Sequence, residues 1–96
     1  MTEIIITPRA RGDIEEAIAQ LELPSDTWAR VRHSLRVIET FPLAGKQLSG
    51  VWRDCRALIG PWGWLIVVYM YIESEDEVRV ITVQDGRSAG AAPAKR

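Results

Sequence analysis

The stretch from Trp62 to Ile72, WGWLIVVYMYI, decides the fold because it is apolar on both faces of an extended strand. Successive side chains of a strand point to opposite faces, and from Trp64 onward both alternating sets are apolar. Such a strand belongs in a sheet that is covered on both sides. Two short helices provide only one covering layer, so we expect a second polypeptide to cover the other face.

Length and composition predict one folded domain. The 96 residues are 47% hydrophobic and 26% charged, which is ordinary for a globular chain. We expect the domain to span residues 1–88 and residues 89–96 to form a flexible tail. The net charge of −1 disfavours a protein that grips nucleic acid mainly through phosphate contacts.

Cysteine use and hydropathy predict a cytoplasmic protein with no membrane segment. Cys55 is the single cysteine, so an internal disulfide is excluded and a reducing compartment fits best. The N-terminus lacks a basic segment followed by a long apolar run, as a signal peptide would require. The central apolar run is about half as long as a bilayer-spanning helix.

The remaining sequence predicts one strand, two helices and three further strands. In the first helix Ile14, Ala17, Ile18 and Leu21 recur at the spacing of a single helical stripe. Thr7 with Pro8 provides its start, or Asp13 a later one, and Pro24 closes it. The expected elements are a strand over 3–7, helices over 8–23 and 26–41, a loop over 43–50, and strands over 52–59, 64–72 and 78–84.

Short connections between the last three strands predict antiparallel pairing. Two consecutive amphipathic helices form an αα-hairpin whose stripes need a common surface. The expected fold class is therefore α+β, a two-layer β-α-α-β-β-β arrangement with a mostly antiparallel sheet and the hairpin on one face.

Several kinds of catalytic site are disfavoured by the residues present. His33 and Cys55 provide no cluster of zinc ligands, and no motif of the Ser-His-Asp kind is visible. The glycines at Gly60 and Gly63 precede a strand, whereas a phosphate-binding loop precedes a helix. We expect no cofactor and no metal, and we interpret His33 as a surface residue.

Arginines near the strand ends are the remaining candidates for function. Arg53 and Arg56 precede the central strand, and Arg87 follows the last one. A strand end is a rigid place from which a guanidinium reaches a phosphate or a carboxylate. Arg87 is the strongest of these candidates, and Asp85 is placed to hold it by a salt bridge.

The order of FPLAGKQLSG, CRALIG, WLIVVYMY and VRVITVQDGR resembles the RelE/ParE superfamily of toxins from bacterial type II toxin–antitoxin modules. The resemblance covers residues 3–88. The residues that match the family's signature positions are Leu48-Ser49-Gly50, Arg56, Tyr69 and Arg87. It implies a toxin without a cofactor that a cognate antitoxin neutralises, with a segment of the antitoxin lying across the apolar face. The alternative use of that face is homodimerisation.

The superfamily divides by target, and the resemblance favours the ParE-like, plasmid-stabilisation branch, which poisons DNA gyrase. RelE-like members instead cleave mRNA in the ribosome. Here Ile66 stands where the strand motif would place an arginine, and no lysine cluster surrounds Arg56. No Tyr or His lies beyond Arg87, and Asp85-Gly86-Arg87 resembles the H-G-R ending of ParE-like members. The alternatives are a ribosome-dependent endonuclease and a non-toxic interaction module.

Two sets of site residues follow from these interpretations. If the chain is a nuclease, the catalytic candidates are Arg56 and Arg87. The residues expected to contact a target or the antitoxin are Arg53, Arg56, Trp64, Tyr69, Tyr71, Asp85 and Arg87.

Overall fold

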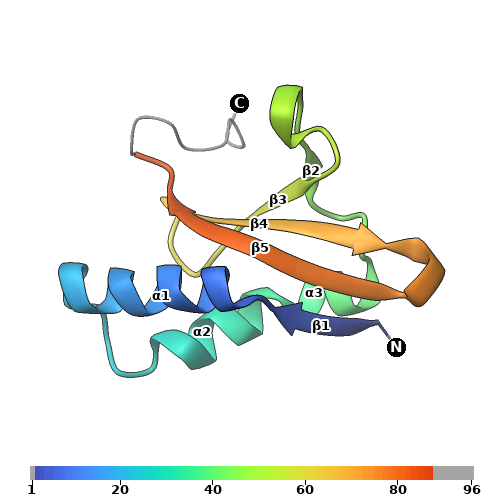
Figure 1. Ribbon diagram of the computed structural model, residues 1–96. Coiled ribbons are helices and arrows are strands. Elements are labelled where there is room, and N and C mark those ends of the chain that lie inside the picture. The colour runs from blue at the N-terminus through green and yellow to red at the C-terminus, as the bar shows by residue number, and fades with distance from the viewer. Residues whose placement is uncertain (1, 88–96) are drawn as a thin grey trace.

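Five strands form one sheet with helices on one face, in a computed structural model that describes residues 2–87 (Figure 1). This confirms the predicted α+β fold with a mostly antiparallel sheet. Within residues 2–87, no helix has both the length and the apolarity needed to cross a membrane. The elements are β1 (Glu3–Ile6), α1 (Pro8–Leu21), α2 (Thr27–Ser34), α3 (Arg36–Thr40), β2 (Lys46–Gln47), the 3-10 turn η1 (Gly50–Trp52), β3 (Arg56–Ile59), β4 (Leu65–Ile72), the 3-10 turn η2 (Glu73–Glu75) and β5 (Glu77–Asp85).

Helix α1 begins as its sequence predicts. The Thr7 hydroxyl accepts a hydrogen bond from the Ala10 N–H at 3.2 Å, and Pro8 occupies the first turn, where its missing N–H has no cost. Asp13 lies inside the helix, so the alternative later start was wrong. The helix ends at Glu22, which adopts a left-handed conformation with φ 50°.

The expected second helix is two helices, because the chain tightens at Leu35. The Leu35 N–H is shared between the carbonyls of Val31 and Arg32, each at 3.1 Å. Sharing one donor between the i−3 and i−4 carbonyls is typical of a 3-10 turn at a helix end. Leu35 and Ile38 are nevertheless buried, so the predicted apolar stripe continues through the break.

The sheet has the strand order β1-β5-β4-β3-β2. Strand β4 pairs antiparallel with β3 and β5, whereas β1 pairs parallel with β5. The predicted strand over 52–59 was wrong in its first half, where η1 turns the chain before β3 begins. A bulge in β5 lies opposite Val68 and Tyr69, so two residues of β5 are accommodated against one position of β4.

The main core lies between the helices and the sheet. It joins buried residues of α1, α2 and α3 to one face of β4 and β5, including Leu65, Val67 and Tyr69 of β4. Tyr69 is 0% exposed. The helices therefore cover the face of β4 that carries Leu65, Val67 and Tyr69, a choice between the two faces that the sequence pattern left open.

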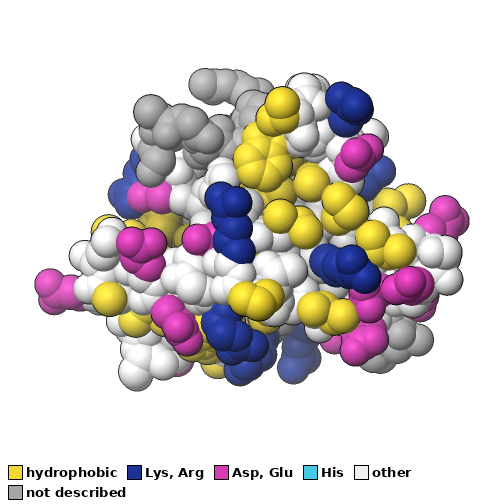
Figure 2. Space-filling model, viewed as in Figure 1, with side chains coloured by type: hydrophobic (Ala, Val, Ile, Leu, Met, Phe, Trp, Pro, Cys, Tyr) yellow, Lys and Arg dark blue, Asp and Glu magenta, His cyan; other side chains and the backbone are white. Residues whose placement is uncertain are grey.

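The other face of β4 is covered in part by the protein itself, which corrects the expectation that a second polypeptide must cover it. Ile66 and Val68 are 1% and 0% exposed, in a cluster with Leu48 and Cys55 from the segment around η1. Figure 1 shows η1 on the side of the sheet opposite the helices. Figure 2 shows hydrophobic side chains gathered from η1 over the strands. The first five residues of β4, Leu65 to Tyr69, are therefore buried without a partner.

Candidate functional site

Arg87 is held where β5 ends. Its Nε and Nη2 donate to the two oxygens of the Asp85 carboxylate at 2.9 and 2.8 Å, and its backbone N–H donates to the same carboxylate at 2.9 Å. These bonds raise the pKa of the Arg87 guanidinium above its ordinary value. The predicted salt bridge between Asp85 and Arg87 is confirmed.

Gly86 allows this close turn between β5 and β4. Its N–H donates to the Trp64 carbonyl at 2.6 Å. A Cβ at this position would lie 2.7 Å from Cδ1 of Ile66, so a larger residue would require the Ile66 side chain to shift. The glycine thus lets the chain after β5 pass close to β4 beside Trp64.

Arg87 begins a column of stacked side chains. Its guanidinium lies 4.6 Å from the ring centroid of Trp64, and Trp62 stacks on Trp64 at 5.8 Å with an interplanar angle of 10°. Arg30 of α2 lies 5.9 Å from the Trp62 ring and pairs with Asp26 at 3.0 Å. Each cation–π contact at a surface contributes about 0.5–1 kcal/mol, so the column ties α2 to the exit of β5.

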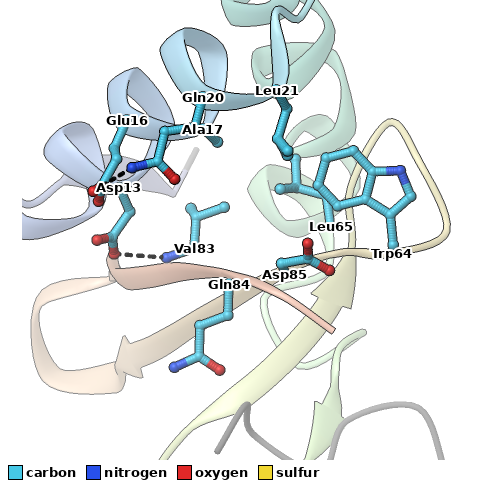
Figure 3. Close-up of a pocket in the computed structure, with 10 residues that line it drawn as sticks. All are labelled: Asp13, Glu16, Ala17, Gln20, Leu21, Trp64, Leu65, Val83, Gln84 and Asp85. Carbon is cyan, nitrogen blue, oxygen red and sulfur yellow. Dashed lines mark hydrogen bonds between the residues drawn. The ribbon is translucent and has the colours of Figure 1, made fainter. Parts of the chain in front are cut away.

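A cavity of about 250 Å³ adjoins Trp64, between α1 and the paired ends of β4 and β5 (Figure 3). Among its polar lining residues is Asp13, whose Oδ2 accepts from the Thr82 hydroxyl at 2.5 Å and from the Val83 N–H at 3.2 Å. Leu21 lies beside the Trp64 indole. The lining residues are Asp13, Glu16, Ala17, Gln20, Leu21, Trp64, Leu65, Val83, Gln84 and Asp85.

Arg56 and Tyr69 form a separate pair that holds the loop before β2. The Tyr69 hydroxyl donates to the Pro42 carbonyl and accepts from the Gly45 N–H, both at 2.8 Å. Nη1 of Arg56 donates to the carbonyls of Leu43 and Gly45 at 3.1 and 2.9 Å. Burial raises the pKa of Tyr69. Both side chains thus stabilise the fold, and Tyr69 presents no surface to a partner.

Tyr71 and Arg53 lie away from both groups. The Tyr71 hydroxyl donates to the Asp76 carboxylate at 2.9 Å, near the β4–β5 hairpin, and this bond raises the pKa of Tyr71. The bonds that Asp76 accepts from Thr2 and Tyr71 lower its own pKa. Arg53 is exposed just after η1.

Of the predicted site residues, the structure brings together Trp64, Asp85 and Arg87. It separates Arg56 from Arg87: Arg56 pairs with Tyr69, whereas Asp85 pairs with Leu65 at the other part of β4. Arg56 and Asp85 are thus four residues apart along the strand direction and two strand spacings apart across the sheet. This places their Cα atoms roughly 15 Å from each other. In the structure the two catalytic candidates have different partners: Arg56 bonds the carbonyls of Leu43 and Gly45, and Arg87 bonds Asp85.

Sequence reasoning missed three contributors to this site: Trp62, Arg30 and Asp13. The alternating Trp62-Gly63-Trp64 pattern could have indicated a stacked pair, because residues two apart share a strand face. Nothing in the sequence links Arg30 or Asp13 to the end of β5. Within residues 2–87, no group of three or more His, Cys, Asp and Glu side chains is arranged to hold a metal ion.

Known structures share this fold. The RelBE2 toxin–antitoxin complex from Mycobacterium tuberculosis matches with a TM-score of 0.70 and 20% identity, over 88% of this chain and 96% of that one. The isolated Escherichia coli RelE toxin matches with a TM-score of 0.66 and 21% identity, over 94% and 89%. The intact E. coli RelBE complex matches with a TM-score of 0.68 and 17% identity, over 92% and 100%.

These likenesses show that the chain has the RelE-like fold. The sequence itself matches no protein-family model and no curated protein. The three structures are RelE toxins or RelBE complexes, and none of them points to the ParE-like branch specifically.

Proposed function

We propose that this protein is the toxin of a type II toxin–antitoxin pair and that a cognate antitoxin protein neutralises it. The observation that carries this proposal is the fold, which is shared with RelE alone and with toxin–antitoxin complexes over at least 88% of this chain. The order of sequence motifs from Leu48 to Arg87 supports it independently. A toxin of this class acts in the cytoplasm.

Exposed apolar side chains support a protein partner. Val51 is 94% exposed, Phe41 64% and Leu43 59%, although all three are large and hydrophobic. Phe41 and Leu43 lie two residues apart in the chain, and contiguous exposed apolar surface is typical of a site that a partner covers. A second copy of the chain is the alternative occupant.

For the target we propose DNA gyrase, as for the ParE-like branch. The arrangement of the arginines supports this choice over a nuclease. Arg56 is bonded to two backbone carbonyls, Arg87 is paired with Asp85, and the two are separated along the sheet. An arginine is a weak general base, so neither residue alone provides the proton transfer that RNA cleavage requires. Gyrase poisoning requires a binding surface, which Trp64, Asp85 and Arg87 form together.

The second candidate is a ribosome-dependent mRNA endonuclease. It is favoured by the three structures described above, which are RelE or RelBE structures. In that case Arg56 and Arg87 would bind the transition-state phosphate from separate positions.

Two assays with the purified protein separate these candidates. We expect inhibition of gyrase supercoiling and no transcript cleavage on translating ribosomes. Arg87→Ala should weaken the gyrase inhibition, whereas Arg9→Ala, an exposed arginine of α1 outside the candidate site, serves as the matched control. Ribosome-dependent cleavage without gyrase inhibition would establish the second candidate and refute the first.

A further inference from the structure

Three exposed arginines of the helical layer lie close together without a carboxylate partner. The guanidiniums of Arg11 in α1 and Arg32 in α2 lie 5.4 and 5.5 Å from the ring centroid of Trp28. Arg36, the first residue of α3, follows Arg32 by about one helical turn. Within residues 2–87, no salt bridge joins any of the three to a carboxylate. We call these residues the helical arginine group.

The arrangement of this group works against folding. Like charges one helical turn apart destabilise a helix, as Arg32 and Arg36 do here. Arg11 brings a third positive charge to the ring that Arg32 already contacts. Stacking on the indole offsets part of the repulsion. A polyanion bound across the group would neutralise all three charges at once, so the arrangement is typical of a binding surface.

Gly12, the residue after Arg11, is a second feature that the packing of the protein does not explain. Glycine in a helix interior is less favourable than alanine because it loses more conformational freedom on folding. Gly12 is exposed, and a Cβ at this position would have no atom within 4 Å. A bare stretch of α1 allows a broad partner to approach the backbone beside Arg11.

The net charge of −1 is unevenly distributed over the molecule. Four acidic residues lie within residues 73–77, at the hairpin between β4 and β5, which is at the end of the sheet away from α1 (Figure 1). On the helical side, Asp26 pairs with Arg30 at 3.0 Å, outside the group. Glu39 lies one turn beyond Arg36 and limits the group at that end. The positive potential of the group is therefore local.

From these observations we propose that the helical arginine group binds the phosphate backbone of duplex DNA without sequence preference. A guanidinium forms paired hydrogen bonds to phosphate oxygens. Each DNA strand carries a phosphate about every 3.4 Å along the axis, so one strand can contact both Arg32 and Arg36. Arg11 lies across the Trp28 ring on the other helix and contacts the same duplex.

The surroundings of Trp28 favour a duplex over a single strand. Proteins that bind single strands stack unpaired bases on open aromatic rings. Two guanidiniums already contact the Trp28 ring, so it is not an open platform for bases. Duplex DNA is also the molecule on which gyrase acts, and only a role of this contact in gyrase poisoning rests on the proposed function.

The test measures binding of the full-length protein to a fluorescein-labelled duplex of about 20 base pairs by fluorescence anisotropy. Salt is varied from about 25 to 200 mM. Three phosphate contacts predict that the logarithm of the association constant falls against the logarithm of salt concentration with a slope of about −3. Two duplexes of unrelated sequence should bind equally.

Matched variants locate the contact. Arg11→Gln, Arg32→Gln and Arg36→Gln should each bring the slope about one unit closer to zero, whereas Arg32→Lys retains the charge and should retain the slope. Lys46→Gln removes the same charge from β2, at the opposite edge of the sheet, and should leave the slope unchanged. Arg36 makes neither of the Trp28 contacts, so Arg36→Gln tests the proposal even if the other two variants fail to fold.

Several results would overturn the proposal. Absence of duplex binding at about 25 mM salt is one, and an equal effect of Lys46→Gln and Arg36→Gln on the slope is another. Tighter binding of a single strand or of an RNA duplex of the same sequence would also refute it. So would equal binding of a polyglutamate peptide of the same charge, which would assign the group to an acidic protein.

Two further outcomes separate this inference from the proposed function. If the duplex binds as expected and gyrase supercoiling is not inhibited, the DNA contact stands and the gyrase assignment fails. If the protein inhibits gyrase and does not bind the duplex, the gyrase assignment stands and this inference is wrong.

Discussion

Tyr69 is the residue whose hydroxyl contributes most clearly to the fold. It bonds the Pro42 carbonyl and the Gly45 N–H from a fully buried position. Tyr69→Phe would leave both backbone groups without that partner and should lower the free energy of unfolding by about 1–3 kcal/mol. Urea denaturation measures this loss. Tyr71→Phe is the control, since its hydroxyl bond to Asp76 is exposed, and an equal loss in both variants would contradict the account.

Asp76 should make stability depend on pH in the acidic range. Bonds from Thr2 and Tyr71 lower its pKa in the folded protein below the ordinary value of 3.8. A lowered folded pKa adds stability above the unfolded pKa, and this stability is lost as the pH falls through the folded value. Asp76 has φ 48°, a conformation that asparagine also adopts, so Asp76→Asn is a suitable comparison.

The urea midpoint of the wild-type protein should therefore exceed that of Asp76→Asn at pH 6. The difference should shrink as the pH falls below 3.8. A difference that stays constant from pH 6 to the acidic limit would show that Asp76 acts through something other than its charge.

For single residues, the sequence predicted bonds between near neighbours in the chain better than bonds between distant residues. Arg87 and Asp85 are two residues apart, so their salt bridge could be predicted from local spacing. Arg56 and Tyr69 were predicted as surface site residues because nothing nearby in sequence shows that they bond the 42–45 loop. Contacts across 11 to 27 residues depend on the sheet register, which single-residue patterns do not specify.

Among the elements, the bulge in β5 is held by α1. Asp13 accepts bonds from the Thr82 hydroxyl and the Val83 N–H, so a helix side chain satisfies a strand amide next to the bulge. Asp13→Ala should reduce the free energy of unfolding by about 1–3 kcal/mol. Glu16→Ala, one turn away and exposed, should change it by about 0.5 kcal/mol or less. Thermal melts of the two variants measure this contrast. Similar melting temperatures would refute the stabilising role of the Asp13 bonds.

Strand β4 provides the second test at this scale. Val68 is 0% exposed, although it lies on the face that the helices do not cover. Val68→Asp should destabilise the protein by about 3–5 kcal/mol because an unpaired carboxylate would be buried. Ile59→Asp, at a 44% exposed position of β3, is the control. Unchanged unfolding of Val68→Asp would mean that η1 does not cover this face.

The order and type of most elements were predictable because the apolar periods of β4 and α1 are strong. The break at Leu35 was not predictable, because the apolar spacing of the helix continues through it. The 3-10 turn η1 was not predictable either, because residues 52–59 have an ordinary strand pattern. The parallel pairing of β1 with β5 joins residues 74 apart, and no local signal specifies it.

For the whole molecule, the covering of the sheet by η1 changes the reason for expecting a partner. Residues 65–69 of the central strand are buried without a second chain. The case for one now depends on the exposed Phe41, Leu43 and Val51 and on the shared fold with toxins that form complexes.

The most direct test of the toxin assignment is induced expression of the protein alone in a bacterial host, with separate labelling of new DNA, RNA and protein. The account predicts rapid growth arrest in which DNA synthesis stops first, and Arg87→Ala at equal expression should delay it. Undiminished growth, with all three syntheses continuing at the rate of an uninduced culture while folded protein accumulates, would contradict it.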